Sequence, residues 1–306
     1  MRIGVDLGGT KVEAMALDEH GHELKRVRVP TPQHDYPGTV NSIATLVLDL
    51  ENEIGAHATV GVGIPGTVVA STGLVKNANS TWLNGQPLER DLSLALGREV
   101  RCANDANCFA ISEATDGAAT GAPVVFGVIL GTGCGGGVVV RGEGLSGPNG
   151  LAGEWGHTAL PWPTAEEWPG PACYCGRHGC LETWISGTAF QREFQRVTGR
   201  SMKAVEIVAA ANAGDAQAED ALERLEDRLA RGLSTIVNVI DPDVIVLGGG
   251  LSQVDRLYSG EVSRRLRDYG FGGGVETPIV RNLHGDSSGV RGAAWLWPAD
   301  TAHTHR

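Results

Sequence analysis

The chain has 306 residues, of which 42% are hydrophobic and 5% aromatic, and its formal net charge at pH 7 is -11. This length exceeds the usual size of a single-core domain and predicts two lobes. The acidic balance argues against a broad surface for nucleic acid or anionic membranes, and no apolar run approaches the roughly 20 residues that a membrane span needs.

Apolar strands alternate with helical patterns along the chain, which is typical of α/β proteins. The first half is expected to hold strands at 2–7, 12–17, 23–29, 59–64 and 100–103 and helices at 38–54 and 106–117. A stretch of small residues at 117–123 is interpreted as a hinge. The second half is expected to hold strands at 124–130, 137–140 and 244–247 and helices at 187–198, 203–213, 216–239 and 286–297.

A strand–glycine turn–strand unit occurs once in each half. The first turn is Asp6-Leu7-Gly8-Gly9-Thr10-Lys11 and the second is Gly131-Thr132-Gly133-Cys134-Gly135, while Gly248-Gly249-Gly250 ends a third strand. One such turn alone is better explained by a plain β-hairpin, and no turn fits the Walker or dinucleotide pattern. Together they favour a nucleotide, because backbone N–H groups in glycine turns can approach phosphates closely.

Asp105 follows an apolar strand and precedes a helical pattern, so it lies at the carboxyl end of a strand. It could cap the helix, as Asn and Asp often do, or act as a general base toward an attacking hydroxyl. An unperturbed pKa of about 4 suffices for a base in phosphoryl transfer, because the proton moves late. Donors and acceptors for a polyol are available in Asn104, Glu154, His157 and Glu182.

Three cysteines and a histidine form a candidate metal site. They lie in Glu154-Trp155-Gly156-His157 and Cys173-Tyr174-Cys175-Gly176-Arg177-His178-Gly179-Cys180-Leu181-Glu182. This is the ligand set of a closed structural zinc site, and a bound metal would also hold the two flanking glutamates in place. A disulfide between two of the three cysteines would leave the third unpaired. A redox or packing role for the cysteines is an open alternative to zinc, and His178 is an open alternative to His157 as the fourth ligand.

The start of the chain, Met1-Arg2-Ile3-Gly4-Val5-Asp6, has no charged-then-apolar signal pattern. We therefore expect a cytoplasmic protein, in whose reducing environment clustered Cys and His more often bind metal. The other cysteines, Cys102, Cys108 and Cys134, are expected to be buried packing thiols.

These motifs together resemble the ROK sugar kinases of the actin-like ATPase superfamily, over essentially the whole chain. The resemblance rests on the glycine turns, Asn104-Asp105-Ala106-Asn107, Glu154 to His157, the Cys-x-Cys-Gly-x-x-Gly-Cys-x-Glu block and Leu247-Gly248-Gly249-Gly250. It implies the actin-like ATPase (ribonuclease H-like) α/β fold, with two lobes, a duplicated core and an interlobe cleft. The small N-terminal lobe is expected at 1–118 plus about 287–306, and the large C-terminal lobe with the zinc loop at 119–286.

The resemblance implies ATP-dependent phosphorylation of a hexose 6-hydroxyl by a cytoplasmic homodimer, with neither nucleic acid nor membrane as a partner. Asp105 would be the base, and the sugar would be held by Gly66, Asn79, Asn104, Asp105, Glu154, His157 and Glu182. Mg²⁺ would lie near Asp6, and ATP would contact Asp6, Gly8, Gly9, Thr10, Lys11, Gly131, Thr132, Gly133, Gly248, Gly249 and Gly250. Structural Zn²⁺ would be bound by His157 rather than His178, together with Cys173, Cys175 and Cys180.

Two stretches bear on the choice of sugar. Val75 to Pro87 and His284 to Trp297 look like bacterial fructokinases with mannokinase activity, so D-fructose, and also mannose, is the first expectation. N-acetylglucosamine kinase and glucokinase of the same family are the alternatives. Asn79 and Trp82 could instead belong to a solvent loop with a packing tryptophan.

The same fold also serves sugar-sensing transcriptional repressors. Those carry a helix-turn-helix module before the core, whereas here the first strand is expected to begin at Ile3 and the net charge is unsuited to DNA. A non-catalytic sugar sensor is therefore less favoured, and turnover distinguishes the two classes.

Overall fold

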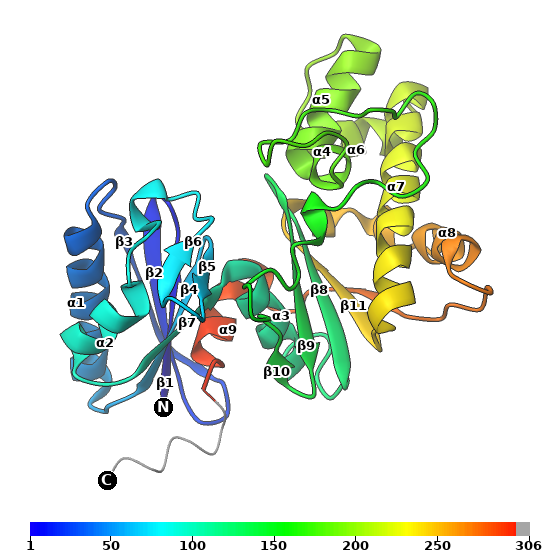
Figure 1. Cartoon of the computed structure of the whole chain (residues 1–306). Coiled ribbons are helices and arrows are strands. Elements are labelled where there is room, and N and C mark those ends of the chain that lie inside the picture. Colours follow the sequence, from blue (N-terminus) through cyan, green and yellow to red (C-terminus); the bar gives the residue numbers. More distant parts are fainter. Residues whose placement is uncertain (298–306) are drawn as a thin grey trace. The chain divides into compact units, whose positions relative to one another are not determined.

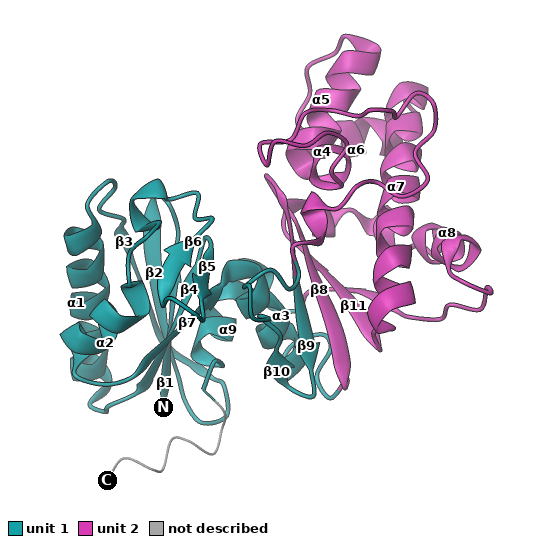
Figure 2. Cartoon of the chain, viewed as in Figure 1, with its two compact units in different colours: residues 1–121, 137–153, 283–306 teal, residues 122–136, 154–282 magenta. Residues whose placement is uncertain are grey.

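The computed structural model describes residues 1–297, so the predicted end of the N-terminal lobe, 298–306, lies outside the described residues. The chain divides into two compact units (Figure 2). Unit 1 contains residues 1–121, 137–153 and 283 onward, and unit 2 contains 122–136 and 154–282. The first boundary falls inside the small-residue stretch 117–123.

Unit 1 is built on a five-stranded sheet in the order β3-β2-β1-β4-β7 (Figure 1). Its strands are β1 (Arg2–Leu7), β2 (Lys11–Leu17), β3 (Glu23–Pro30), β4 (Thr59–Ile64) and β7 (Val100–Asn104). The hairpins β1–β2 and β2–β3 are antiparallel, and β4 and β7 continue the sheet in parallel from β1.

Successive side chains of β1 point to opposite faces of this sheet, and different helices cover the two faces. Ile3, Val5 and Leu7 face the core that includes α1 (Tyr36–Ile54) and α2 (Leu88–Leu96). On the other face, a Cβ on Gly4 would lie 1.9 Å from the carbonyl oxygen of Val290, in α9 (Ser288–Ala294). Glycine thus lets the α9 backbone pack directly on the sheet, and Asp6, two residues further along β1, lies on this same face.

The second sheet repeats the order of the first, as β10-β9-β8-β11-β12. Its strands are β8 (Val124–Leu130), β9 (Cys134–Val140), β10 (Glu143–Gly144), β11 (Val244–Gly248) and β12 (Ile279–Arg281). β11 pairs in parallel with both β8 and β12. The predicted duplication of a strand–glycine turn–strand unit is confirmed, with β1–β2 and β8–β9 at corresponding positions.

Residues 137–153, which the resemblance assigns to the C-terminal lobe, group with unit 1. They pack against α3 (Asp105–Thr115): a Cβ on Gly137 would lie 2.5 Å from the Ala106 carbonyl oxygen, and one on Gly144 would lie 2.7 Å from Ile111. Strand β9 begins at Cys134 rather than at residue 137, so residues 134–136 continue the strand directly after the glycine turn.

Unit 2 adds five helices to its strands: α4 (Glu182–Ile185), α5 (Gly187–Thr198), α6 (Ala204–Asn212), α7 (Ala216–Ile240) and α8 (Glu261–Tyr269). Helix α7 anchors the loop before the clustered cysteines through a buried ion pair. Arg231 donates to both carboxylate oxygens of Glu167, at 2.8 and 2.9 Å, and to the carbonyl of Trp162 at 3.0 Å. Burial acts against ionisation of Glu167, but hydrogen bonds from Arg231 and Arg228 lower its pKa to about 2.

Two acids near the end of α3 tie down the chain where it leaves and re-enters unit 1. Buried Glu113 accepts the backbone N–H groups of Ala118 (2.9 Å) and Leu283 (3.0 Å). Asp116 accepts from the ring of His284 at 3.1 Å, and it also binds Arg291. Both ends of this connection are therefore fixed to the helix that begins with Asp105.

Several short elements were not expected from the sequence: β5 (Thr67–Val69), β6 (Leu74–Lys76), α2, α4, α8, β10 and β12. Helix α8 buries only Val262 and Leu266, so its apolar periodicity is too weak to predict. Helix α9 is shorter than the expected 286–297. Within the described residues no helix is long and apolar enough to cross a membrane.

Candidate functional site

In unit 1, Asn104 positions the start of α3. Its Oδ1 accepts the N–H groups of Ala106 (2.9 Å) and Asn107 (3.4 Å), and its Nδ2 donates to the Gly66 carbonyl at 3.1 Å. Asn104 is thus the N-cap and Asp105 the first residue of the helix. The interpretation of Asp105 as an ordinary N-cap is wrong, because the neighbouring asparagine has that role.

Gly66 lies where a side chain would not fit. A Cβ there would come within 2.7 Å of the Lys76 carbonyl oxygen and 2.9 Å of the Ala78 Cα. Asn79 is bonded back to this turn, since its N–H donates to the Pro65 carbonyl at 3.2 Å, and its side chain is exposed. Gly66, Asn79, Asn104 and Asp105, which the sequence predicts to be sugar-binding, are therefore linked through one hydrogen-bonded loop.

Trp82 is a packing residue, as the alternative interpretation of this loop held. Its indole is half-buried against the unit 1 core, and its Nε1 donates to Thr39 Oγ1 at 3.2 Å. The indole therefore stabilises the loop after Asn79.

Asp6 is the next-to-last residue of β1 and precedes the glycine turn, which is closed by a bond from the Gly8 N–H to the Lys11 carbonyl at 2.9 Å. Burial, followed by the negative charges of Asp105 and Glu13, raises the pKa of Asp6 to about 6, although Lys11 opposes the shift. Asp6 and Asp105 are therefore close enough to interact electrostatically. A cation beside Asp6 would relieve that repulsion.

The raised pKa makes stability depend on pH with a defined sign. Between about pH 4 and pH 6 the folded protein holds a proton on Asp6 that the unfolded chain releases, so this contribution to stability is lost as pH rises through about 6. Asp6→Asn lacks this titration. We therefore compare the free energies of unfolding of the wild type and the variant in magnesium-free buffer. The wild-type value minus the variant value should fall by up to about 3 kcal/mol from about pH 4 to about pH 7. Urea unfolding of both proteins measures it, and a constant difference would contradict the assignment.

In unit 2, the second and third glycine clusters lie side by side. Gly249 has a left-handed φ of 78°, and a Cβ there would lie 2.7 Å from the Leu130 carbonyl and 3.0 Å from the Gly131 nitrogen. The Gly131 carbonyl accepts the N–H of Gly187, the first residue of α5, at 2.8 Å. Gly248 to Gly250 lead into a 3-10 turn, Gly250–Gln253, rather than a longer helix. The cluster thus places exposed backbone beside a helix N-terminus, an arrangement suited to phosphate.

Glu182 connects this turn to the cysteine loop. Its Oε2 accepts the backbone N–H of Cys134 at 3.0 Å, and a Cβ on Gly133 would lie only 2.6 Å from the same oxygen. Glu154 is exposed, and its carbonyl accepts the His157 N–H at 3.2 Å in the 3-10 turn Trp155–His157. Glu182 is therefore held beside the predicted phosphate turn, whereas the Glu154 carboxylate is presented to solvent.

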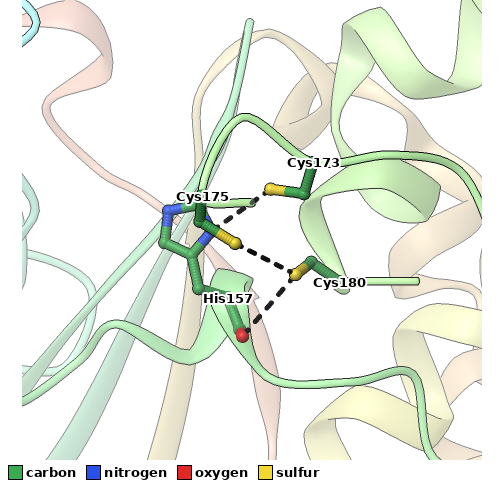
Figure 3. Close-up of side chains that lie close together, drawn as sticks. All are labelled: His157, Cys173, Cys175 and Cys180. Atoms are coloured by element: carbon green, nitrogen blue, oxygen red, sulfur yellow. Dashed lines mark hydrogen bonds between the residues drawn. The ribbon is translucent and has the colours of Figure 1, made fainter. Parts of the chain in front are cut away.

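The predicted zinc ligands come together in unit 2 (Figure 3). Ligand atoms of His157, Cys173, Cys175 and Cys180 all lie within 4.8 Å of one another. The distance from Cys173 Sγ to His157 Nδ1 is 3.6 Å, and that from Cys175 Sγ to Cys180 Sγ is also 3.6 Å. A zinc tetrahedron with Zn–S bonds of about 2.3 Å and Zn–N bonds of about 2.1 Å has edges of about 3.5–3.8 Å. The donor set and spacing therefore fit zinc.

The thiols of the cluster differ in acidity, because a hydrogen bond from the Arg177 backbone lowers the pKa of Cys175 whereas the other two thiols are shifted the opposite way. Burial and the neighbouring thiols raise the pKa of Cys180 to about 12, and burial also raises the pKa of Cys173. A metal would reverse these shifts, because thiolates are the ligands it binds. His178 is exposed and outside the cluster, and all six cysteines are free thiols. Of the expected packing thiols, Cys108 and Cys134 are buried and Cys102 is partly exposed.

The sequence did not predict a contact to the other ring nitrogen of His157. The Tyr174 hydroxyl lies 2.9 Å from His157 Nε2, the ring nitrogen other than the one beside Cys173. No local pattern signals this bond, because it depends on how the loop between Cys173 and Cys175 turns back toward His157.

Comparison with known proteins decides the family. A family model described as the ROK family matches residues 2–300. The chain belongs to the ROK family. An N-acetyl-D-glucosamine kinase from Vibrio cholerae is 42% identical over 300 residues, which cover 97% of this chain and 99% of that protein.

Two solved ROK structures share the fold. A ROK hexokinase from Thermus thermophilus has a TM-score of 0.85 and 34% identity over 96% of each chain. A ROK family glucokinase from Streptomyces griseus, solved in complex with glucose and AMPPNP, has a TM-score of 0.75 and 28% identity over 96% of this chain and 98% of that one. The chain is therefore a ROK sugar kinase with the expected actin-like ATPase fold.

Proposed function

We propose that this ROK kinase transfers the γ-phosphoryl group of ATP to the 6-hydroxyl of N-acetylglucosamine. The observation that carries the choice of sugar is the near full-length similarity, at 42% identity, to a protein named N-acetyl-D-glucosamine kinase. Two features of the chain support phosphoryl transfer itself. Asp105 begins a helix whose cap is already supplied by Asn104, and glycine turns occur at matched positions of both sheets.

In this proposal Asp105 accepts the proton of the attacking sugar hydroxyl. Asp105 is the first residue of α3, which is capped by Asn104, and one oxygen of its carboxylate also accepts the N–H of Ala106 at 2.8 Å. By the family resemblance, the residues that would hold the sugar are Gly66, Asn79, Asn104, Glu154, His157 and Glu182. Phosphoryl transfer depends mainly on such positioning and on neutralising charge.

The phosphates would be held by backbone N–H groups of the turns Gly8 to Thr10 and Gly131 to Gly133, by Lys11, and by Gly248 to Gly250 near the adenosine. Asp6 would hold Mg²⁺, which supplies charge neutralisation at the phosphates when bound. The raised pKa of Asp6 fits this role, because the repulsion between Asp6 and Asp105 that contributes to it would be offset by a cation.

We also propose that His157, Cys173, Cys175 and Cys180 bind a structural zinc ion, which would hold His157 and the loop leading to Glu182. With four protein ligands the ion would have no open position and no chemical role of its own. Its contribution would be to fix two groups predicted to hold sugar.

Fructose, the first expectation from the sequence, is the second candidate. Several residues of the two stretches that favour it make contacts within the protein. Trp82 bonds Thr39, while in the second stretch His284 and Trp295 bond Asp116 and Ser288 bonds Glu113. Residues that make contacts within the protein are weak evidence for the identity of the sugar, so we prefer N-acetylglucosamine to fructose as the substrate.

The test is a panel of kcat/KM values for N-acetylglucosamine, fructose, mannose and glucose with magnesium and ATP. We expect N-acetylglucosamine to have the highest value. A higher value for fructose would transfer the assignment to fructokinase, and no ADP formation with any of the four would reject the kinase proposal in favour of a non-catalytic sugar sensor.

A further inference from the structure

Tyr174 makes a specific contact at the position where the proposed function requires a sugar. Its hydroxyl lies 2.9 Å from His157 Nε2, and the two rings meet edge to face with centroids 5.0 Å apart and an interplanar angle of 89°. The side chain is nevertheless 75% exposed. The contact is therefore made at the protein surface and not by burial in a core.

The two nitrogens of His157 face different partners. Nδ1 lies 3.6 Å from Cys173 Sγ, inside the cluster that fits zinc. A nitrogen that binds metal carries no proton, so with the metal bound Nε2 carries the proton and donates to the tyrosine oxygen. Nε2 is thus the one polar atom of this ring left to hold a sugar hydroxyl, and Tyr174 already uses it.

We propose that Tyr174 is a specificity-determining residue: in the sugar-free protein its hydroxyl takes the place of a sugar hydroxyl at His157 Nε2, and an arriving sugar displaces it. This inference rests on the proposed function, because it requires His157 to bind sugar. Displacement is feasible because the backbone is held on both sides by Cys173 and Cys175 while the exposed ring can rotate away. Only a sugar that presents a hydroxyl at this position replaces the lost bond.

The proposal predicts that Tyr174→Phe binds sugar more tightly. The variant keeps the ring but has no hydroxyl to displace, so the sugar Kd measured by calorimetry should fall by about 2- to 10-fold, the range of one net hydrogen bond. The KM for ATP and the zinc content should not change. One monodeoxy analogue of the preferred sugar should bind the variant and the wild type equally well. It is the analogue that lacks the hydroxyl proposed to displace Tyr174.

Tyr269→Phe is the matched control. It likewise removes one tyrosine hydroxyl, but that hydroxyl has no proposed contact with sugar and donates to the Asp227 carboxylate at 2.7 Å. It should leave the sugar Kd unchanged. An unchanged Kd for Tyr174→Phe would overturn the proposal, and a weaker one would show that Tyr174 contacts the bound sugar directly, which also overturns it. If the wild type binds no sugar, the proposed function fails instead, so the two failures are distinguishable.

Discussion

Asp105→Asn should abolish detectable turnover while the protein still binds sugar and ATP. Loss of a general base lowers rates by about 10²- to 10⁴-fold, and asparagine cannot accept the proton of the attacking hydroxyl. The fold should tolerate the change, because Asn104, not Asp105, caps α3. Removing the charge should also lower the pKa of Asp6, whose elevation comes partly from Asp105. Binding of magnesium and ATP should therefore not weaken.

The measurement is steady-state turnover together with calorimetric titration of sugar and of ATP with magnesium. Asp49→Asn, at an exposed position of α1, is the control for loss of one negative charge and should keep full activity. Wild-type turnover in Asp105→Asn would assign the base to another residue. Loss of both binding and turnover would mean that Asp105 maintains the site and is not specifically the base.

The second large effect is expected from the cysteine cluster. Cys175→Ala should lower zinc content and weaken sugar binding together, the latter by about 10- to 100-fold, as is typical when the support of a functional histidine is lost. Cys175 is the best choice because it is exposed, so its removal leaves no buried cavity, unlike removal of Cys180. Elemental analysis gives the zinc content and calorimetry the sugar affinity.

His178→Ala is the matched control for this experiment, since His178 is exposed in the same loop but outside the cluster. It should retain zinc and sugar affinity. Loss of zinc from Cys175→Ala with unchanged sugar affinity would break the proposed connection between the metal and His157. Full zinc content in Cys175→Ala would remove that residue from the ligand set.

The elements that could be predicted from the sequence are those whose residues are used locally. Strands β1, β4 and β8 and helix α5 have the predicted bounds, because continuous apolar runs and clear helix ends signal them. The clustering of the three cysteines with a histidine was expected from their residue types and spacing, and the family resemblance selected His157 over His178. In the fold, the ligand atoms of these four residues lie within 4.8 Å of one another.

Features that depend on distant segments could not be predicted. The close packing of Gly137 and Gly144 against α3 has no signal in the local sequence. Asn104 and Asp105 are equally good caps by residue type, and only the loop at Gly66 decides between them. The contact of Tyr174 with His157 and the role of Glu113 in holding residues 118 and 283 also arise between segments that no local pattern relates.

The most direct test of the central proposal is to identify the product by NMR after incubating the protein with magnesium, ATP and N-acetylglucosamine. We predict that the γ-phosphate signal of ATP is replaced by ADP and by a phosphate monoester coupled to the protons on carbon 6 of the sugar. Unchanged ATP, or a phosphate on another hydroxyl, would contradict the proposed reaction.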